Sequence, residues 1–282
     1  MPFTNSIASF LHAVPSHLPQ SQHERLALAV GAAALIGSSA LIIPAAYRDY
    51  TIFKSYGPGG LPNNIFGWVF VRGLYQHFGR EMLSTEEYDR RKDAAEGHGK
   101  EDEGYLTLTP EQLALRQKDG RPVIGPHVVP QRQLTQVPDE DVMEKLSTTF
   151  RSFGLRNHHL VKSQRSNLEA HADALFLADN LPATDLAVQM KGEITHLHQG
   201  NDHSAHLILA PTDCKRVIDA GWGQRHAFSG ISAMPFLTFG MVNNLPSEYI
   251  LIYAPRNEEE IEVVMQIIAA SVKFMTGREN VR

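Results

Sequence analysis

An uncharged apolar run from Leu26 to Ala46 constrains this chain more than any other feature of its sequence. At about 1.5 Å per residue, a helix of this length reaches across the roughly 30 Å hydrocarbon core of a bilayer. Charged residues close the run on both sides: Glu24 and Arg25 before it, Arg48 and Asp49 after it. We therefore predict a membrane-spanning helix over residues 26–47, preceded by an N-terminal tail over residues 1–25.

Two other interpretations of the run are a cleaved signal peptide and the buried core helix of a soluble protein. A signal peptide has a positively charged start and a shorter apolar stretch than this one. Arg25 precedes the run, whereas Arg48 and Lys54 follow it, and this charge bias predicts that the C-terminal part faces the cytosol. We expect a single-pass protein of the endoplasmic reticulum membrane, with membrane lipid as a partner.

The remaining composition indicates a sizeable globular part. The chain has 282 residues, of which 43% are hydrophobic, so one generous domain can bury a core. Its net charge of −5 is spread out and forms no basic cluster, so nucleic acid is not an expected partner. Cys214 is the single cysteine, which excludes an internal disulfide framework, and we predict a structural role for it.

After residue 84, helix signals are followed by strand signals. Capping boxes at Ser84 and Thr109 and a helix start at Pro138 predict a helical part over residues 84–155. Within residues 160–282, alternating apolar residues predict strands at 169–175, 193–198, 203–210 and 249–254. A last helix should begin after Asn257 and end at Gly277. We predict an α+β domain over residues 48–282, with a mixed or antiparallel sheet layered with helices.

The segment between the apolar run and these helices is rich in aromatic side chains. Within Ile65–Leu83 they are Phe66, Trp68, Phe70, Tyr75 and Phe78. Trp and Tyr are favoured at the boundary between membrane and water. The segment therefore either lies at the membrane surface or packs into the domain, and the sequence leaves both arrangements open.

Histidines gather on two of the predicted strands. His196 and His198 should point to one face, because successive side chains of a strand alternate between faces. His206, on the returning strand, lies opposite His196 only if the connecting loop has an odd number of residues, and the sequence leaves this register open. The same alternation predicts that Glu193 points away from both strand histidines.

Further candidate residues occupy a predicted strand and two loops: Glu169, His171, Trp222, Arg225, His226, Tyr253 and Arg256. Glycines around Trp222 allow a tight turn that presents several side chains together. Arg256 comes just before the last helix, where free backbone N–H groups and the helix dipole favour an anion. These residues, taken with the strand histidines, predict a polar site in the last third of the chain.

Two kinds of chemistry fit this site. In one, His196, His198 and a carboxylate or a third histidine ligate a metal, although Glu193 on the opposite face weakens this hypothesis. In the other, neutral histidines and arginines form a metal-free pocket for an acidic, enol-like organic substrate. The Gly-x-Ser-x-Gly signature of a serine nucleophile is absent from the sequence.

The chain resembles the fungal luciferase family, the membrane-anchored enzymes of luminous mushrooms that oxidise 3-hydroxyhispidin. The resembling pieces follow the family's order: Arg48–Tyr50, His127–Val129, Gln131–Gln133, Glu169–His171, Glu193–His198, His206–Leu207, Gly221–His226 and Tyr253–Glu260. The chain departs from the family in a longer acidic segment around Gly97–Leu108 and a longer apolar insert over Ile231–Asn243. Because that insert should lie beside the pocket, the resemblance leaves the identity of the substrate open.

The resemblance implies oxidation of a hydroxylated α-pyrone by O2 with loss of CO2, without metal, flavin or nicotinamide. A neutral histidine would remove the enol proton, and arginine would stabilise the peroxide anion. We accordingly expect no cofactor besides O2 as co-substrate, and catalysis by His196, His198, His226, Arg225 and Arg256. We expect the pyrone-like substrate to bind among Glu169, His171, Glu193, His206, Trp222 and Tyr253. Two alternatives are a non-luminous relative with a different reaction in secondary metabolism and a non-catalytic small-molecule binding module.

Overall fold

The computed structural model describes residues 21–89, 103–169, 171–232 and 244–282. The chain divides into two compact units, Met1–Thr51 and Ile52–Arg282. Helix α2 (Gln22–Ser55) contains the apolar run and continues into the first residues of the second unit. Among the described residues it is the one helix long and apolar enough to cross a membrane, and its apolar window is fully exposed.

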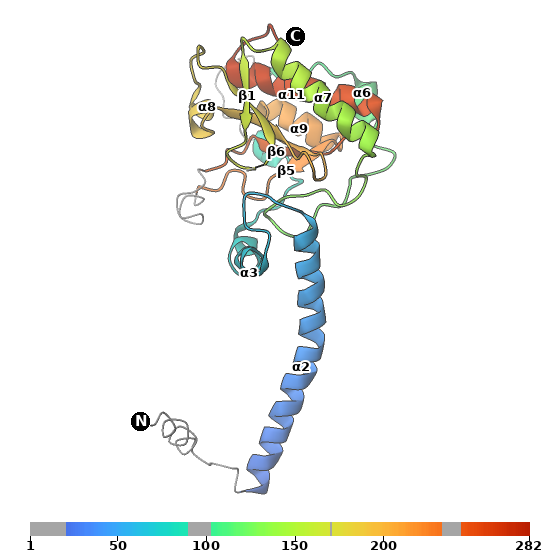
Figure 1. The fold of residues 1–282 in the computed structure, drawn as a ribbon, viewed down its shortest axis with the longest axis vertical. Helices are drawn as coiled ribbons and strands as arrows, with labels where there is room; N and C mark the ends of the chain where they lie inside the picture. The colour runs from blue at the N-terminus through green and yellow to red at the C-terminus, as the bar shows by residue number, and fades with distance from the viewer. Residues whose placement is uncertain (1–20, 90–102, 170, 233–243) are drawn as a thin grey trace, which may run out of the picture. The chain divides into compact units, whose positions relative to one another are not determined.

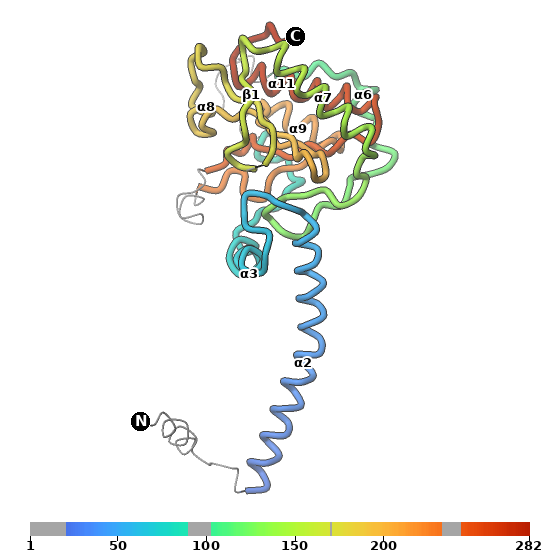
Figure 2. Tube along the Cα trace, in the orientation of Figure 1, coloured from blue at the N-terminus to red at the C-terminus, as the bar shows by residue number. Residues whose placement is uncertain are grey.

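The second unit is built on an antiparallel sheet, whose strands Figure 1 draws as arrows and whose chain path Figure 2 traces as a tube. In the described part of the chain its strands are β1 (Val161–Arg165), β2 (Asp173–Leu177), β3 (Glu193–Leu197), β4 (Ala205–Ile208), β5 (Gly223–Arg225) and β6 (Tyr249–Ile252). They lie in the order β1-β2-β3-β4-β6-β5, and every neighbouring pair is antiparallel. The predicted α+β class is confirmed, and the sheet is antiparallel rather than mixed.

Helices cover one face of this sheet. They are α7 (Glu140–Arg156), α9 (Pro211–Asp219) and α11 (Glu258–Thr276). The described part of the second unit also contains shorter helices: α3 (Ile65–Gly73), the 3-10 helix η1 (Tyr75–Phe78), α6 (Pro110–Ala114) and α8 (Asp185–Gln189). Helix α11 packs against β3 and β4, and α7 packs against α11 and β1. Leu207 and Ile250 are paired across β4 and β6 and belong to the same buried cluster as Ile268 of α11.

The predicted helix ends are confirmed where capping side chains fix them. Asn257 accepts a hydrogen bond from the backbone N–H of Glu260 at the start of α11. Gly277 ends this helix with a φ of 63°, a left-handed conformation that favours glycine. At the start of α6, Thr109 and Gln112 form the expected capping box.

The hairpin between β3 and β4 settles the register that the sequence leaves open. Leu197 pairs with Ala205, and His196 pairs with His206. Directly paired residues of antiparallel strands point to the same face of the sheet. His206 therefore joins His196 and His198 on the face opposite Leu207.

The prediction that Glu193 points away from the histidines is wrong. Thr195 pairs with Leu175 in β2, but the next pair joins Glu193 to Phe176, so the register shifts by one residue at Ile194. Such a β-bulge sets two residues of one strand against one of its partner, and this reverses the alternation beyond it. The bulge turns Glu193 toward His196, whose Nδ1 lies 2.8 Å from Glu193 Oε1.

Candidate active site

A cavity of about 210 Å³ lies on the histidine face of the sheet. The sheet side of its lining consists of His196, His206, His226 and Tyr249. The other walls come from Tyr75 of η1 and from loops: Gly60, Leu61, Val129, Pro130, Gln131, Arg132, Asn167, Leu168, Glu169, Phe228 and Leu245. Mostly apolar walls with a few convergent polar groups are typical of a small-molecule site.

A buried carboxylate orients the imidazole of His196. Both side chains are 2% exposed, and His196 Nδ1 donates to Glu193 Oε1. Ser166 Oγ donates to the same oxygen at 2.6 Å, and the Asn167 N–H donates to Oε2 at 2.7 Å. Burial raises the pKa of Glu193, but these hydrogen bonds, the one from His196 foremost, outweigh it and hold the pKa below its ordinary value. With its Nδ1 proton fixed, a neutral His196 ring presents Nε2 as its proton acceptor.

Burial keeps two other histidines of the cavity, His206 and His226, in the neutral form. His206 Nδ1 lies 3.3 Å from the Ile250 carbonyl, and its ring stacks on Tyr249 with centroids 4.8 Å apart. His226 Nδ1 accepts the Phe228 N–H at 3.0 Å, so neutral His226 carries its proton on Nε2. Burial, reinforced by the neighbouring histidines, lowers the pKa of His206 well below its ordinary value and that of His226 to about 3.

His198 lies beside this group in a polar cluster. Its Nδ1 is 3.2 Å from Asp202 Oδ1 and 3.0 Å from Ser204 Oγ. The guanidinium of Arg132 approaches the same ring, 3.3 Å from Nε2. Burial and then the Arg132 charge lower the pKa of His198. Although Asp202 is also buried, His198 and Arg132 hold its pKa at about 2.

Arg132 is the main residue of the cavity that sequence reasoning misses. It is 2% exposed, lines the cavity and pairs with Glu169 at 2.5 Å. Glu169 also lines the cavity, as expected for a residue that binds substrate. The segment around Arg132 has neither helical nor strand periodicity, so the sequence pattern does not predict that Arg132 is buried. Only the family resemblance singles out Gln131–Gln133. Gln131 is missed for the same reason, and its Oε1 is buried without a hydrogen-bond partner among the described residues. Tyr249 also lines the cavity and is missed although it lies in a predicted strand, because the apolar run of that strand does not show which face it lines.

Three of the histidines also meet the geometric requirement of a metal site. One nitrogen from each of His196, His198 and His206 lies within 4.8 Å of the other two. The Arg132 guanidinium lies 3.3 Å from His198 Nε2, and its positive charge would repel a metal cation bound at that nitrogen. The other ring nitrogen, Nδ1, faces Asp202 and Ser204. The charge next to His198 therefore fits a metal ion poorly.

The structure places Arg225 and His171 outside the cavity lining. Arg225 pairs with Ile250 on the sheet, so strand alternation directs it to the face opposite His206. There its guanidinium pairs with Glu87 at 2.6 Å. His171 is exposed, just before β2. Neither side chain lies with the histidine group.

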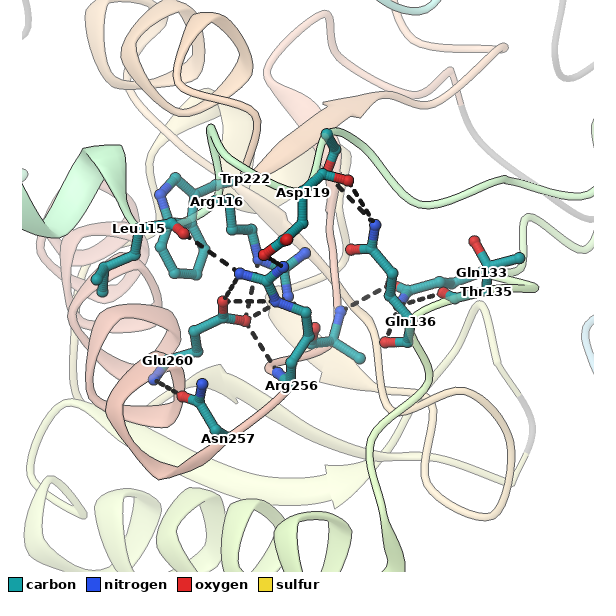
Figure 3. A network of polar contacts seen from close by, with 12 residues as sticks. Leu115, Arg116, Asp119, Gln133, Thr135, Gln136, Trp222, Arg256, Asn257 and Glu260 are labelled. Carbon is teal, nitrogen blue, oxygen red and sulfur yellow. Dashed lines mark hydrogen bonds and ion pairs between the residues drawn. The ribbon is translucent and has the colours of Figure 1, made fainter.

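Arg256, Trp222 and Tyr253 belong to a separate polar network, shown in part in Figure 3. Arg256 Nε donates to Glu260 Oε1 at 2.7 Å, and its Nη1 pairs with Asp119 Oδ2 at 2.6 Å. Trp222 stacks against Arg116, which also pairs with Glu260, and the Tyr253 hydroxyl donates to Gln224 Oε1. None of the three side chains lines the cavity. Two carboxylates neutralise the Arg256 charge, so it is not directed at an anion in the cavity.

This network yields a first prediction. Arg256→Ala should lower the free energy of unfolding by about 1–2 kcal/mol, because charged hydrogen bonds are lost while Arg116 still pairs with Glu260. Turnover per folded molecule should stay within about threefold of the parent, a change of less than 1 kcal/mol in the activation free energy. Thermal unfolding and turnover are measured together, with exposed Arg278→Ala as the control. A hundredfold loss of turnover at unchanged stability would instead assign anion binding to Arg256.

Comparison with known proteins places the chain in a family. The sequence model of the Luciferase domain matches residues 191–271, which run from just before β3 into α11. The luciferase of Armillaria mellea is 36% identical over 261 residues, that of Armillaria ostoyae 35% over 260, and each alignment covers 89% of both chains. The luciferase of Neonothopanus nambi is 33% identical over 250 residues, 85% of both chains. No solved structure gives a significant match.

These similarities extend over most of the chain, well beyond the matched domain. An α+β domain with a histidine-lined cavity thus defines the class, a luciferase-like protein. The chain belongs to the fungal luciferase family.

Proposed function

We propose that this protein is a membrane-anchored oxygenase that oxidises a hydroxylated α-pyrone or a similar enol with O2 and releases CO2, without metal or organic cofactor. One observation carries the proposal: His196, held by the buried Glu193 behind it, lines the same cavity as the buried cation of Arg132. An oriented base and a fixed positive charge are what an acidic enol needs to become a reactive anion.

The first step is removal of the enol proton. His196 accepts it on Nε2, and Glu193 stabilises the imidazolium that forms. The enolate then gives one electron to O2, and the two resulting radicals combine into a C–O bond that leaves a peroxide anion. Arg132 and the Nε2–H of His226 are the donors that stabilise this anion before it collapses with loss of CO2.

The remaining lining suits an aromatic or unsaturated substrate. Phe228, Leu245 and Tyr249 provide apolar surface that limits water near a hydrolysable intermediate. Gln131 Oε1 has no partner among the described residues and is available to a hydroxyl group of the substrate. Residues 233–243, which make up most of the apolar insert, lie outside the described residues, so these walls are the ones that the described part of the chain contributes.

The function is tested by oxygen uptake and photon counting with purified protein and a 3-hydroxy-α-pyrone. Uptake with light emission supports the luciferase reaction. Uptake without light assigns the protein to the non-luminous alternative in secondary metabolism. Tight binding of the pyrone without uptake assigns it to the class of small-molecule binding modules and refutes the proposal.

A second prediction concerns metal. Because Arg132 occupies the position next to His198 where a metal would need neutral or negative surroundings, exhaustive chelation should leave turnover unchanged. Elemental analysis of active protein should find no stoichiometric zinc, iron or copper. Bound metal that disappears in both His196→Ala and His206→Ala would support the metal hypothesis instead.

A third prediction concerns the apolar helix. Because the apolar window of α2 is exposed rather than buried, we propose that it spans the membrane and that the second unit lies in the cytosol. The full chain should stay with membranes after carbonate extraction. A chain starting at Tyr50, which keeps the buried Phe53 and Tyr56, should be released by carbonate. A full chain that is freely soluble would contradict the anchor.

A further inference from the structure

Helix α3 exposes large apolar side chains on one side. Ile65 is 45% exposed, Val69 54% and Phe66 78%, and Phe78 of η1 is also exposed. The opposite side packs on the rest of the second unit: Gly67 and Val71 are buried, and a Cβ at Gly67 would touch the Phe53 ring at 3.5 Å. The helix is therefore fixed with this apolar face outward. Such a face on a soluble protein typically marks a contact with another surface.

The stretch of sequence that contains α3 carries charges of one sign. No Asp or Glu occurs between Tyr50 and Arg80, whereas Lys54, Arg72 and Arg80 all fall within that stretch. The whole chain carries a net charge of −5, so the local excess of cations runs against its composition. Apolar side chains flanked by lysine and arginine suit a bilayer with anionic lipids, because acyl chains accept the former and headgroups the latter.

The same helix is connected to the wall of the cavity. Leu61 precedes α3 and Tyr75 follows it, and both line the cavity. The ring of Phe70 in α3 packs edge-on against Tyr75 at 4.7 Å, and Tyr75 packs against Phe228 at 5.4 Å. An aromatic chain thus leads from α3 to the apolar lining.

We propose that α3 is a membrane-surface helix whose apolar face inserts into the bilayer, so that an apolar substrate passes from the lipid to the cavity past Leu61 and Tyr75. Two observations favour lipid over a protein as the partner of this face. The sequence around α3 contains basic but no acidic residues, and Ile65 follows Ala46, at the end of the proposed membrane span, by only nineteen residues. Insertion is independent of the reaction, whereas the route of the substrate rests on the proposed function.

Insertion is tested on the full chain in mixed phosphatidylcholine–phosphatidylserine vesicles. Phe66→Cys carries an environment-sensitive fluorophore. The matched control is Leu155→Cys, 73% exposed near the end of α7, a helix that lies well apart from α3 in Figure 1. The native Cys214 is fully buried and should not label. Nitroxide-bearing lipids should quench the label at position 66 several-fold more than the label at 155. Equal quenching, or a label at 66 shielded from aqueous iodide but not quenched by lipid, overturns insertion, the latter in favour of a protein partner.

The route of the substrate is tested with the double variant Phe66→Ser/Val69→Ser. For a pyrone bearing a long alkyl chain, presented in the same vesicles, KM should rise about tenfold, since two apolar anchors are lost. The KM for a short, water-soluble pyrone and both kcat values should stay unchanged. Equal KM changes for the two pyrones, or none, overturn delivery from lipid. Because the quenching experiment needs no turnover, failure of the proposed reaction is recognised separately.

Discussion

Replacing His196 by Gln is expected to lower kcat about a thousandfold, the middle of the range for loss of a positioned general base. KM should change little, because Gln retains a polar side chain of similar size at the cavity wall. Raising the pH should partly restore turnover, since the enol then ionises in solution before it binds. Stopped-flow oxygen uptake across a pH series measures all three quantities.

Two companion variants show whether orientation of the imidazole matters. In Glu193→Gln the new amide group can donate to His196 Nδ1, which favours the tautomer with its proton on the wrong nitrogen, and kcat should again fall at least about a hundredfold. His158→Gln, an exposed histidine on the same unit, should retain full activity. Near-normal kcat in His196→Gln would remove the base from the mechanism.

The second large effect is expected at Arg132. Arg132→Gln should lower turnover about a hundredfold, as loss of one donor to a developing anion does. It should also lower the free energy of unfolding by about 3 kcal/mol, because Glu169, only 6% exposed, is left without its counter-ion. Turnover per folded molecule and chemical denaturation are measured on the same preparation.

A double variant separates these two effects. Arg132→Gln/Glu169→Gln removes the unpaired charge, so much of the lost stability should return while turnover stays low. If turnover returned together with stability, Arg132 would serve only as the counter-ion of Glu169, and anion stabilisation would have to come from elsewhere.

Local rules predict much of the fold of this chain, although the strand predicted at 169–175 begins only at Asp173 and leaves Glu169 and His171 outside it. Capping side chains such as Asn257 and Thr109 act within a few residues, so their effect can be read directly from the sequence. Strand alternation likewise places His196 and His198 on one face correctly. The register of a hairpin depends on the conformation of its loop, so only the structure shows that His206 pairs with His196.

The candidate site is predicted less well, because its composition depends on distant contacts. Arg132 and Arg256 are both arginines near helix or loop boundaries, and only tertiary packing directs the first into the cavity and the second toward Asp119 and Glu260. Arg225 and His226 are adjacent in sequence, yet alternation sends only His226 into the cavity lining. A helix N-terminus alone was therefore a poor guide to where an anion binds.

Because of the bulge at Ile194, the contact between Glu193 and His196 depends on the number of residues in β3 as well as on their identities. Removing one residue there would restore regular pairing with β2 and turn the Glu193 carboxylate to the helix-covered side, while every strand kept its neighbours. Two homologues could thus share the same glutamate and histidine in an alignment and differ in whether the two side chains meet. Within this family, a gap of a single position in β3 would separate proteins that keep the oriented histidine from those that keep only its scaffold.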